Sequence, residues 1–224
     1  MIRVYVVVEG ATEEAFVRDV LGPTLCMQSV LLIPRIIGAA GHQGGRVSYD
    51  RAKHDISHFL KQERGAFCTT MFDFYGLGSG FTKSLLPTGL ANREKVARIE
   101  AAVKSDLAGS LPESLRVDVR FLPYLQLHEY EGLLFSDPDA FALAIDEPRL
   151  MPQFRRIRGE FATPEDIDDG LQSAPSKRVA AAFASYDKVL HGVLAAKSVG
   201  IAAMRRECPH FNQWVASLER LATP

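Results

Sequence analysis

The N-terminal stretch Met1-Ile-Arg-Val-Tyr-Val-Val-Val-Glu9-Gly10-Ala11-Thr12-Glu13-Glu14 decides the fold. Residues 2–8 form a β-branched run with almost no polar side chain, which is typical of a central strand covered on both faces. The run stops at Glu9-Gly10. Thr12 is then a candidate N-cap for a helix that opens with two acidic residues and is weakened at Gly22-Pro23. The stretch predicts a β-turn-α unit.

The same alternation continues as far as residue 127. We expect further strands at 30–37, 66–72 and 117–122, with helices at about 48–62 and 92–107 between them. Strands that alternate with helices indicate βαβ units, and these give a mostly parallel sheet with right-handed crossovers. The pattern predicts an α/β fold with a Rossmann-like, four-stranded sheet flanked by helices.

After residue 127 the sequence predicts only helices. The expected ranges are 128–135, 138–145, 149–158, 176–183, 187–196, 201–207 and 211–221. In the last of these, Trp214 belongs to an apolar stripe that indicates a buried face. We therefore predict a core at 1–127 and a helical portion at 128–224 that packs on this core as one compact unit.

Composition excludes several classes of protein. The chain has 224 residues, 47% hydrophobic content and a net charge of −1, which indicates a globular protein without a strongly basic surface. Cys26, Cys68 and Cys208 are odd in number and widely spaced, so we expect reduced, buried thiols. No apolar run is long enough for a signal peptide or a membrane span, and a cytoplasmic protein without a membrane partner is expected.

Acidic residues follow the predicted strands. Glu9 ends the first strand, Asp73 follows the third, and Glu129 and Glu131 lie shortly after the fourth. In an open parallel sheet, ligands bind at the carboxyl ends of the strands, so these side chains are expected to converge. Like charges that converge need a shared proton or a cation, and carboxylate oxygens suit Mg²⁺.

Each acid also has a structural interpretation. Glu13 and Glu14 lie in the first turn of a helix, where negative charge complements the helix dipole. Glu129 and Glu131 point the same way only on an extended segment, so we expect one of the two to have a structural role. Glu9 and Asp73 favour function, because each ends an apolar run where a charge is costly unless it is paired.

Basic and glycine-rich segments give weaker signals. Lys177 and Arg178 follow Pro175-Ser176 and are candidate catalytic cations that would stabilise developing charge, with a solvated helix start as the alternative. The glycine-rich segment 38–45 either cradles a phosphate or is a plain connector. His128 and His191 are candidates for proton transfer, although hydrogen-bonded structural histidines are more common.

Several motifs carry a resemblance to known families. The segment Val7-Val8-Glu9-Gly10-Ala11-Thr12-Glu13-Glu14 resembles the first motif of Toprim domains, in particular those of the overcoming-lysogenization-defect (OLD) nucleases. Across nearly its whole length the chain is similar to the bacterial family known as domain of unknown function 4276, which is regarded as Toprim-like. Four further motifs carry this similarity: Thr70-Met-Phe-Asp73-Phe-Tyr75-Gly-Leu77, Pro123-Tyr-Leu-Gln-Leu-His128-Glu129-Tyr-Glu131-Gly-Leu-Leu-Phe135, Pro175-Ser-Lys177-Arg178 and Tyr186-Asp-Lys188-Val-Leu-His191-Gly192.

The resemblance implies a Toprim-like fold and a metal-dependent nuclease, with DNA rather than RNA as the expected substrate. Glu9, Glu13 and Asp73 would be ligands of Mg²⁺ or Mn²⁺, and one or both of the later acids, Glu129 and Glu131, would complete the shell. Toprim domains carry Asp-x-Asp at the third strand, whereas this chain reads Asp73-Phe74-Tyr75.

The resemblance also implies a biological role and a partner protein. It suggests an effector of antiphage defence that works with an ABC-type or SMC-like ATPase, since this chain has no Walker motif of its own. Whether the chain forms a homo-oligomer is left open.

Two other functions fit the same residues. The missing second carboxylate favours a Toprim-like regulatory or adaptor subunit whose acids accept hydrogen bonds instead of binding metal. A phosphohydrolase or phosphotransferase for a small molecule would use the glycine segment and Lys177 to hold a phosphate, and it would need a closed pocket.

Overall fold

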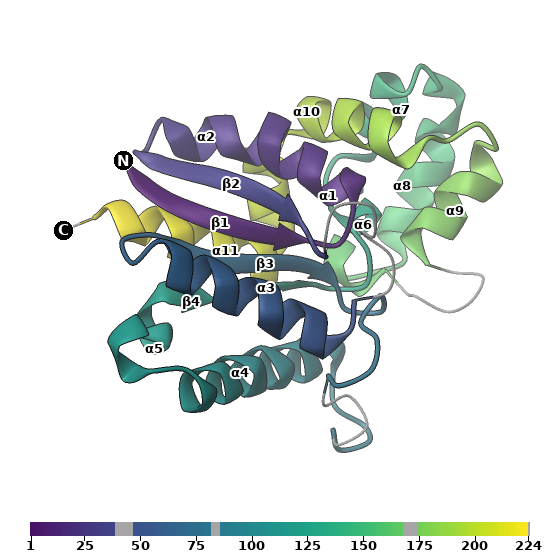
Figure 1. The fold of residues 1–224 in the computed structure, drawn as a ribbon. Helices are drawn as coiled ribbons and strands as arrows, with labels where there is room; N and C mark the ends of the chain where they lie inside the picture. The colour runs from purple at the N-terminus through teal and green to yellow at the C-terminus, as the bar shows by residue number, and fades with distance from the viewer. Residues whose placement is uncertain (39–46, 82–85, 168–173, 224) are drawn as a thin grey trace.

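In the computed structural model, which describes residues 1–38, 47–81, 86–167 and 174–223, five strands form one sheet. Every pairing between these strands in the described parts is parallel, and the order is β2-β1-β3-β4, with β5 also paired to β3 (Figure 1). The strands are β1 (Ile2–Val8), β2 (Val30–Ile36), β3 (Phe67–Asp73), β4 (Phe121–Leu122) and β5 (Leu125–Gln126). The predicted α/β class and mostly parallel sheet are confirmed.

Helices cover both faces of the sheet. On one face, Tyr5 and Val7 of β1 pack in a cluster with α3 (Tyr49–Gln62) and α4 (Asn92–Ser110). On the other face, the alternate residues Val4, Val6 and Val8 belong to a second cluster with residues of the helices that follow β1 and of the C-terminal helices. Figure 1 shows helices on both sides of the sheet. The side chains of β1 alternate between two buried faces, which explains why the strand is apolar throughout.

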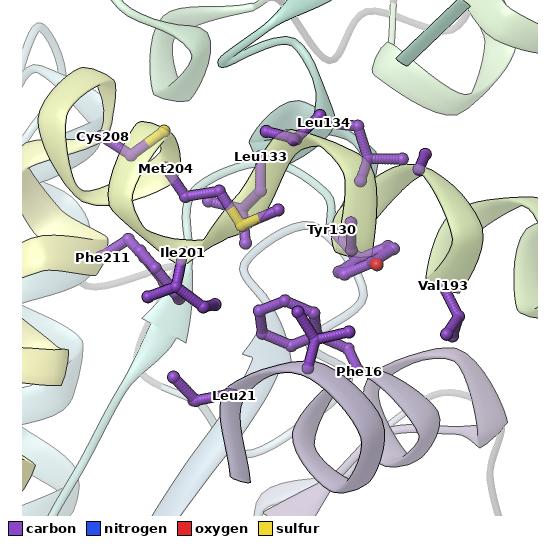
Figure 2. Packing of buried hydrophobic residues seen from close by; sticks show 14 of the residues in the cluster. Phe16, Leu21, Tyr130, Leu133, Leu134, Val193, Ile201, Met204, Cys208 and Phe211 are labelled. Atoms are coloured by element: carbon purple, nitrogen blue, oxygen red, sulfur yellow. The ribbon is translucent and has the colours of Figure 1, made fainter. Parts of the chain in front are cut away.

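The C-terminal helices share a core with β1 and the first helices. Figure 2 shows Phe16 and Leu21 packed against Tyr130, Ile201 and Phe211. The C-terminal helices are α6 (Glu131–Leu134), α7 (Pro138–Ala144), α8 (Met151–Gly159), α9 (Pro175–Ala182), α10 (Lys188–Glu207) and α11 (Pro209–Glu219). The predicted apolar stripe of the last helix is confirmed, because Trp214 is buried there.

The helical segment after β1 differs from its prediction. It comprises α1 (Ala11–Phe16), the π-helical turn η1 (Val17–Leu21) and α2 (Gly22–Cys26), and its N-cap is Gly10 instead of Thr12. Gly22-Pro23 does not end it. The wider π turn finishes at Gly22, so Pro23 lies in the first turn of α2, where a missing N–H is tolerated. Cys26, at the end of α2, is exposed and not buried as expected.

The predicted fourth strand was also wrong in part. Residues Val117–Arg120 form a helical turn, α5, and only Phe121–Leu122 pair with β3. Arg116 has left-handed backbone (φ 49°), and the buried Arg120 side chain donates to four backbone carbonyls, which fixes the turn. β5 resumes pairing beyond Pro123, which has no N–H to donate to a strand.

Other helix boundaries move for local reasons. The helix predicted at 128–135 is only Glu131–Leu134, because His128 has left-handed backbone (φ 62°). The helices predicted at 187–196 and 201–207 correspond to the two helical parts of α10, which are separated by non-helical backbone at Gly200 (φ 77°, ψ 149°). No helix in the described ranges is long and apolar enough to cross a membrane. The strands point toward α6 and α9, and the candidate site lies at this end of the sheet (Figure 1).

Candidate metal centre

Glu9 directly follows β1 and lies against the loop after β3. Its Oε2 atom is enclosed and has no hydrogen-bond partner among the described residues. Burial, reinforced by the charge of Glu13, raises the pKa of Glu9 to about 7, and the backbone N–H of Asp73 acts in the opposite direction. A carboxyl group in this state holds a proton near neutral pH unless a cation replaces it.

Asp73 is the last residue of β3, the strand next to β1 in the sheet. Its Oδ1 atom is also enclosed and, in the described structure, has no hydrogen-bond partner. Burial raises the pKa of Asp73 well above its ordinary value, and four further carboxylates act in the same direction: Glu13, Glu131, Glu9 and Glu129. The structure therefore brings all five predicted acids into one electrostatic cluster, which we call the acid centre.

Glu13 and Glu129 each bind backbone at a helix start. Glu13 is buried in the first turn of α1, and its Oε2 accepts the backbone N–H of Gly10 at 2.9 Å. Burial raises its pKa. Glu129 accepts the backbone N–H of Ser176 at 2.9 Å, which links it to the first turn of α9. Both carboxylates therefore stabilise the start of a helix, in addition to contributing charge to the acid centre.

Glu131 lies at the start of α6 and is 1% exposed. Its Oε1 forms an ion pair with Nζ of Lys188 at 3.1 Å. Burial raises the pKa of Glu131, whereas the charge of Lys188 lowers it. Glu131 is the member of the acid centre with a direct cationic partner.

Lys188 is a site residue that the sequence interpretation missed. Burial lowers its pKa, but the attraction of Glu131, Glu129 and Asp73 outweighs this effect and leaves the pKa above its ordinary value. Lys188 is the first residue of α10, whose N-cap Asp187 accepts two backbone N–H groups. A lysine in the first turn of a helix interacts unfavourably with the helix dipole. This unfavourable position was the feature of the sequence that could have marked Lys188 as a site residue.

Lys177 and Arg178 lie on α9, whose first turn is bonded to Glu129. Lys177 is exposed. Arg178 forms a 3.2 Å ion pair with Glu160, and its guanidinium lies 5.4 Å from the centre of the Phe161 ring. The catalytic role predicted for this pair stays a prediction.

The two candidate histidines have ring partners. His128 is buried and stacks on Tyr75, with ring centres 5.3 Å apart. The Nδ1 atom of His191 accepts the backbone N–H of Asp187 at 2.8 Å, and its ring stacks on Tyr186. His191 is thus held in place at the start of α10. The candidate phosphate loop at 38–45 lies, apart from Gly38, outside the described residues.

The donors of the acid centre fit a hard divalent cation in their chemistry. All are carboxylate oxygens, and three of them, on Glu9, Asp73 and Glu131, are enclosed without a hydrogen bond. The Glu131 oxygen has the ion pair with Lys188, whereas those of Glu9 and Asp73 have no ion pair within the described parts of the chain. In their present positions, however, no three His, Cys, Asp or Glu side chains of the described residues are grouped as a metal site. The predicted ligand set therefore requires side-chain movement to close around one ion.

Charge balance gives a separate argument. Among the described residues, Lys188 is the cation whose charge acts on these five carboxylates. Two carboxylates about 4 Å apart repel by roughly 4 kcal/mol at an effective dielectric constant near 20. The pKa values of Glu9, Glu13, Asp73 and Glu131 are all raised, and a cation close to these carboxylates would lower them. The acid centre consequently takes up either protons or cations.

The family comparison agrees with the motifs. A family model with the description "Domain of unknown function (DUF4276)" matches residues 8–219. No curated protein gives a significant match. Among solved structures, the C-terminal region of the OLD protein of Xanthomonas campestris pv. campestris is similar at 14% identity and a TM-score of 0.41, over 96% of this chain and 97% of that chain. A likeness of this degree does not transfer an activity.

Proposed function

We propose that this chain, which belongs to the DUF4276 family, is a metal-dependent phosphodiesterase that cuts nucleic acid, with DNA as the expected substrate. The observation that carries the proposal is the pair of enclosed, unpartnered carboxylate oxygens on Glu9 and Asp73 at the ends of neighbouring strands. Buried polar atoms are rarely left unsatisfied, and exceptions mark sites for an ion or for chemistry.

Glu9 and Asp73 are the proposed ligands of Mg²⁺ or Mn²⁺, with Glu13, Glu129 and Glu131 available to complete the shell. A divalent cation bound there supplies Lewis-acid stabilisation of the charge that develops on a phosphoryl group. Lys188 adds a positive charge that is already fixed by Glu131, so little reorganisation is needed when negative charge develops nearby. Lys177 and Arg178 are proposed to contact the phosphates that flank the scissile bond.

The decisive experiment separates metal binding from cleavage. Mn²⁺ binding is followed by electron paramagnetic resonance, and single-stranded and duplex DNA are incubated with the same protein and Mg²⁺ or Mn²⁺. We expect Glu9→Gln and Asp73→Asn to weaken Mn²⁺ binding by more than the roughly 10–100-fold that loss of a supporting residue costs. Cleavage should be lost in both variants.

A matched control is available in Glu113→Gln, which removes an exposed carboxylate from the turn before α5. This variant should bind Mn²⁺ and cut DNA like the parent protein. Undiminished cleavage in both Glu9→Gln and Asp73→Asn would rule out the site assignment.

A non-catalytic function has one specific observation in its favour. Glu13, Glu129 and Glu131 already have protein partners, as the acids of a regulatory or adaptor subunit would. The Mn²⁺ titration decides between the nuclease and the adaptor. If the chain is an adaptor, the parent protein should bind Mn²⁺ no more tightly than the Asp73→Asn variant does.

The resemblance to OLD-type nucleases supports a further part of the proposal, namely that the chain is an effector of antiphage defence gated by a partner ATPase. Cleavage that appears only when a partner ATPase of the ABC or SMC-like class and ATP are added would support it. Equal cleavage with and without the ATPase would count against this gating but not against the nuclease.

A further inference from the structure

One aromatic side chain next to the acid centre is strongly exposed. Tyr75 is 42% exposed, and it is the only aromatic residue among the exposed large hydrophobic side chains of the described ranges. It lies two residues after Asp73, so their Cα atoms are at most about 7.6 Å apart. Single exposed apolar side chains are common on protein surfaces, so the exposure of Tyr75 matters because of its position beside the acid centre and because of the rings that support it.

The rings of His128 and Phe74 pack against the Tyr75 ring. It stacks on His128 with ring centres 5.3 Å apart and an angle of 7° between the ring planes, and the Phe74 ring packs edge-on at 4.9 Å. His128 is 3% exposed. Two rings stacked in parallel form a rigid, flat surface, whereas an isolated surface tyrosine would be free to rotate.

The support under Tyr75 requires an unusual backbone. His128 has a φ of 62°, a left-handed conformation that is uncommon for a residue with a side chain. Positive φ also occurs at Ser29, Arg116 and Asp146, and histidine adopts it more readily than most residues, so this backbone defines the turn at His128 and is not by itself a sign of function. The next residue is Glu129, so the same turn places a ring under Tyr75 and a carboxylate in the acid centre.

We propose that Tyr75, backed by His128, is a stacking platform for an unpaired base of a single-stranded nucleic acid whose phosphodiester lies at the acid centre. This inference rests on the proposed function and names its substrate class. Every base has a π-face that can stack on an aromatic side chain, whereas the bases of a duplex already cover one another.

Charge explains why stacking suits this position. The acid centre is rich in carboxylates and the whole chain has a net charge of −1, so electrostatic attraction to a polyanion is weak. A neutral base can be held beside carboxylates without repulsion. Binding through Tyr75 should therefore depend less on salt than binding through phosphate contacts does.

The test measures binding of a short single-stranded oligonucleotide that carries 2-aminopurine, with Ca²⁺ in place of Mg²⁺ to suppress cleavage. We expect quenching of 2-aminopurine by the parent protein, and a dissociation constant roughly tenfold to a hundredfold higher for Tyr75→Ala and Tyr75→Leu. Tyr75→Phe should bind within about threefold of the parent, because the ring is retained. Tyr75→Leu keeps surface bulk, so it remains informative if Tyr75→Ala folds poorly.

The matched control is Leu143→Ala, which removes a 56% exposed apolar side chain from α7. It should leave binding unchanged. An abasic oligonucleotide provides a second control, since the parent protein and Tyr75→Leu should bind it equally. The platform is overturned if Tyr75→Leu binds the normal oligonucleotide like the parent, if Tyr75→Phe is as weak as Tyr75→Leu, or if a duplex of the same length binds more tightly.

The platform and the proposed function can fail separately. Absence of Mn²⁺ binding and cleavage in the parent protein would count against the function, whatever the binding of the oligonucleotide. Normal metal binding and cleavage together with Tyr75-independent binding would overturn the platform alone. In Asp73→Asn, cleavage should be lost while quenching by Tyr75 persists.

Discussion

The Cα atom of Gly76 lies against the carboxylate of Glu9. A Cβ atom built at Gly76 would be 2.6 Å from Oε2 and 2.9 Å from Oε1 of Glu9, closer than any side chain can approach without displacement. The loop after β3 thus encloses the carboxylate that ends β1. This contact explains why Oε2 of Glu9 is shielded from water although the residue lies at an open end of the sheet.

Gly76→Ala is accordingly expected to displace Glu9 and impair the acid centre without removing any charged group. Mn²⁺ affinity should fall by about 10–100-fold, the usual effect of losing a residue that positions a ligand. A Mn²⁺ titration measures this change directly. The control is Gly109→Ala in α4, where a Cβ meets nothing within 4 Å. It should stabilise the protein slightly, by about 0.5–1 kcal/mol, and leave Mn²⁺ binding unchanged. If Gly76→Ala binds Mn²⁺ normally, the enclosed state of Glu9 has no role in metal binding.

Lys188 is expected to have opposite effects on metal binding and on cleavage. Lys188→Met removes a cation that competes with a metal for the acid centre, so Mn²⁺ affinity should rise or stay the same. Cleavage should nevertheless fall by about 10²–10³-fold, because a preorganised positive charge is lost. Lys197→Met, at an exposed position of α10, is the control and should change neither quantity. A parallel loss of metal affinity and cleavage in Lys188→Met would show that Lys188 only supports the ligands.

Most of the fold could be predicted from local patterns. The β-branched run 2–8 and the periodicity of 49–62 are strong signals, and both elements lie where they were expected. The failures depend on distant contacts. Nothing near residues 117–120 indicates that Arg120 binds carbonyls at Leu60, Glu63 and Ala66, which turns a strand-like segment into a helical turn.

The candidate site could be predicted only in part, for a similar reason. Acids at strand ends converge because the carboxyl ends of parallel strands share one edge, so Glu9 and Asp73 follow from topology. Lys188 comes from the C-terminal helices, whose position relative to the sheet has no sequence rule. Gly76 and Tyr75 were visible only as members of a motif, because their roles are defined by contacts with Glu9 and His128.

The metal-free protein should become less stable as pH rises toward neutrality. The pKa of Glu9 is about 7 in the folded protein and near 4.5 when unfolded, so its neutral form stabilises the fold. This contribution is complete below pH 4.5 and is lost as pH rises to about 7. Asp73 and Glu131 act in the same direction.

Thermal unfolding between pH 5 and 8 measures the effect. Glu9→Gln should flatten the profile, and Mg²⁺ should raise the unfolding temperature most at the alkaline end. A melting temperature of the metal-free protein that rises over this range would contradict the burial of neutral carboxyl groups.

Arg120 provides a test of the fold that is independent of the acid centre. Its guanidinium is buried and donates to the carbonyls of Ala66, Leu60, Leu115 and Glu63, so it joins the end of α3 to the start of β3 and to the turn before α5. Arg120→Ala would leave these acceptors without partners and should lower the free energy of unfolding by about 3–5 kcal/mol. Arg120→Lys should recover only part of this loss, because an ammonium cannot reproduce the planar fork of donors.

Urea unfolding measures both changes. The control is Arg116→Ala, at an exposed position with left-handed backbone. Mn²⁺ affinity of folded Arg120→Lys should equal that of the parent. A stability loss under about 1 kcal/mol in Arg120→Ala would mean that water replaces the guanidinium and that the helical turn has another cause.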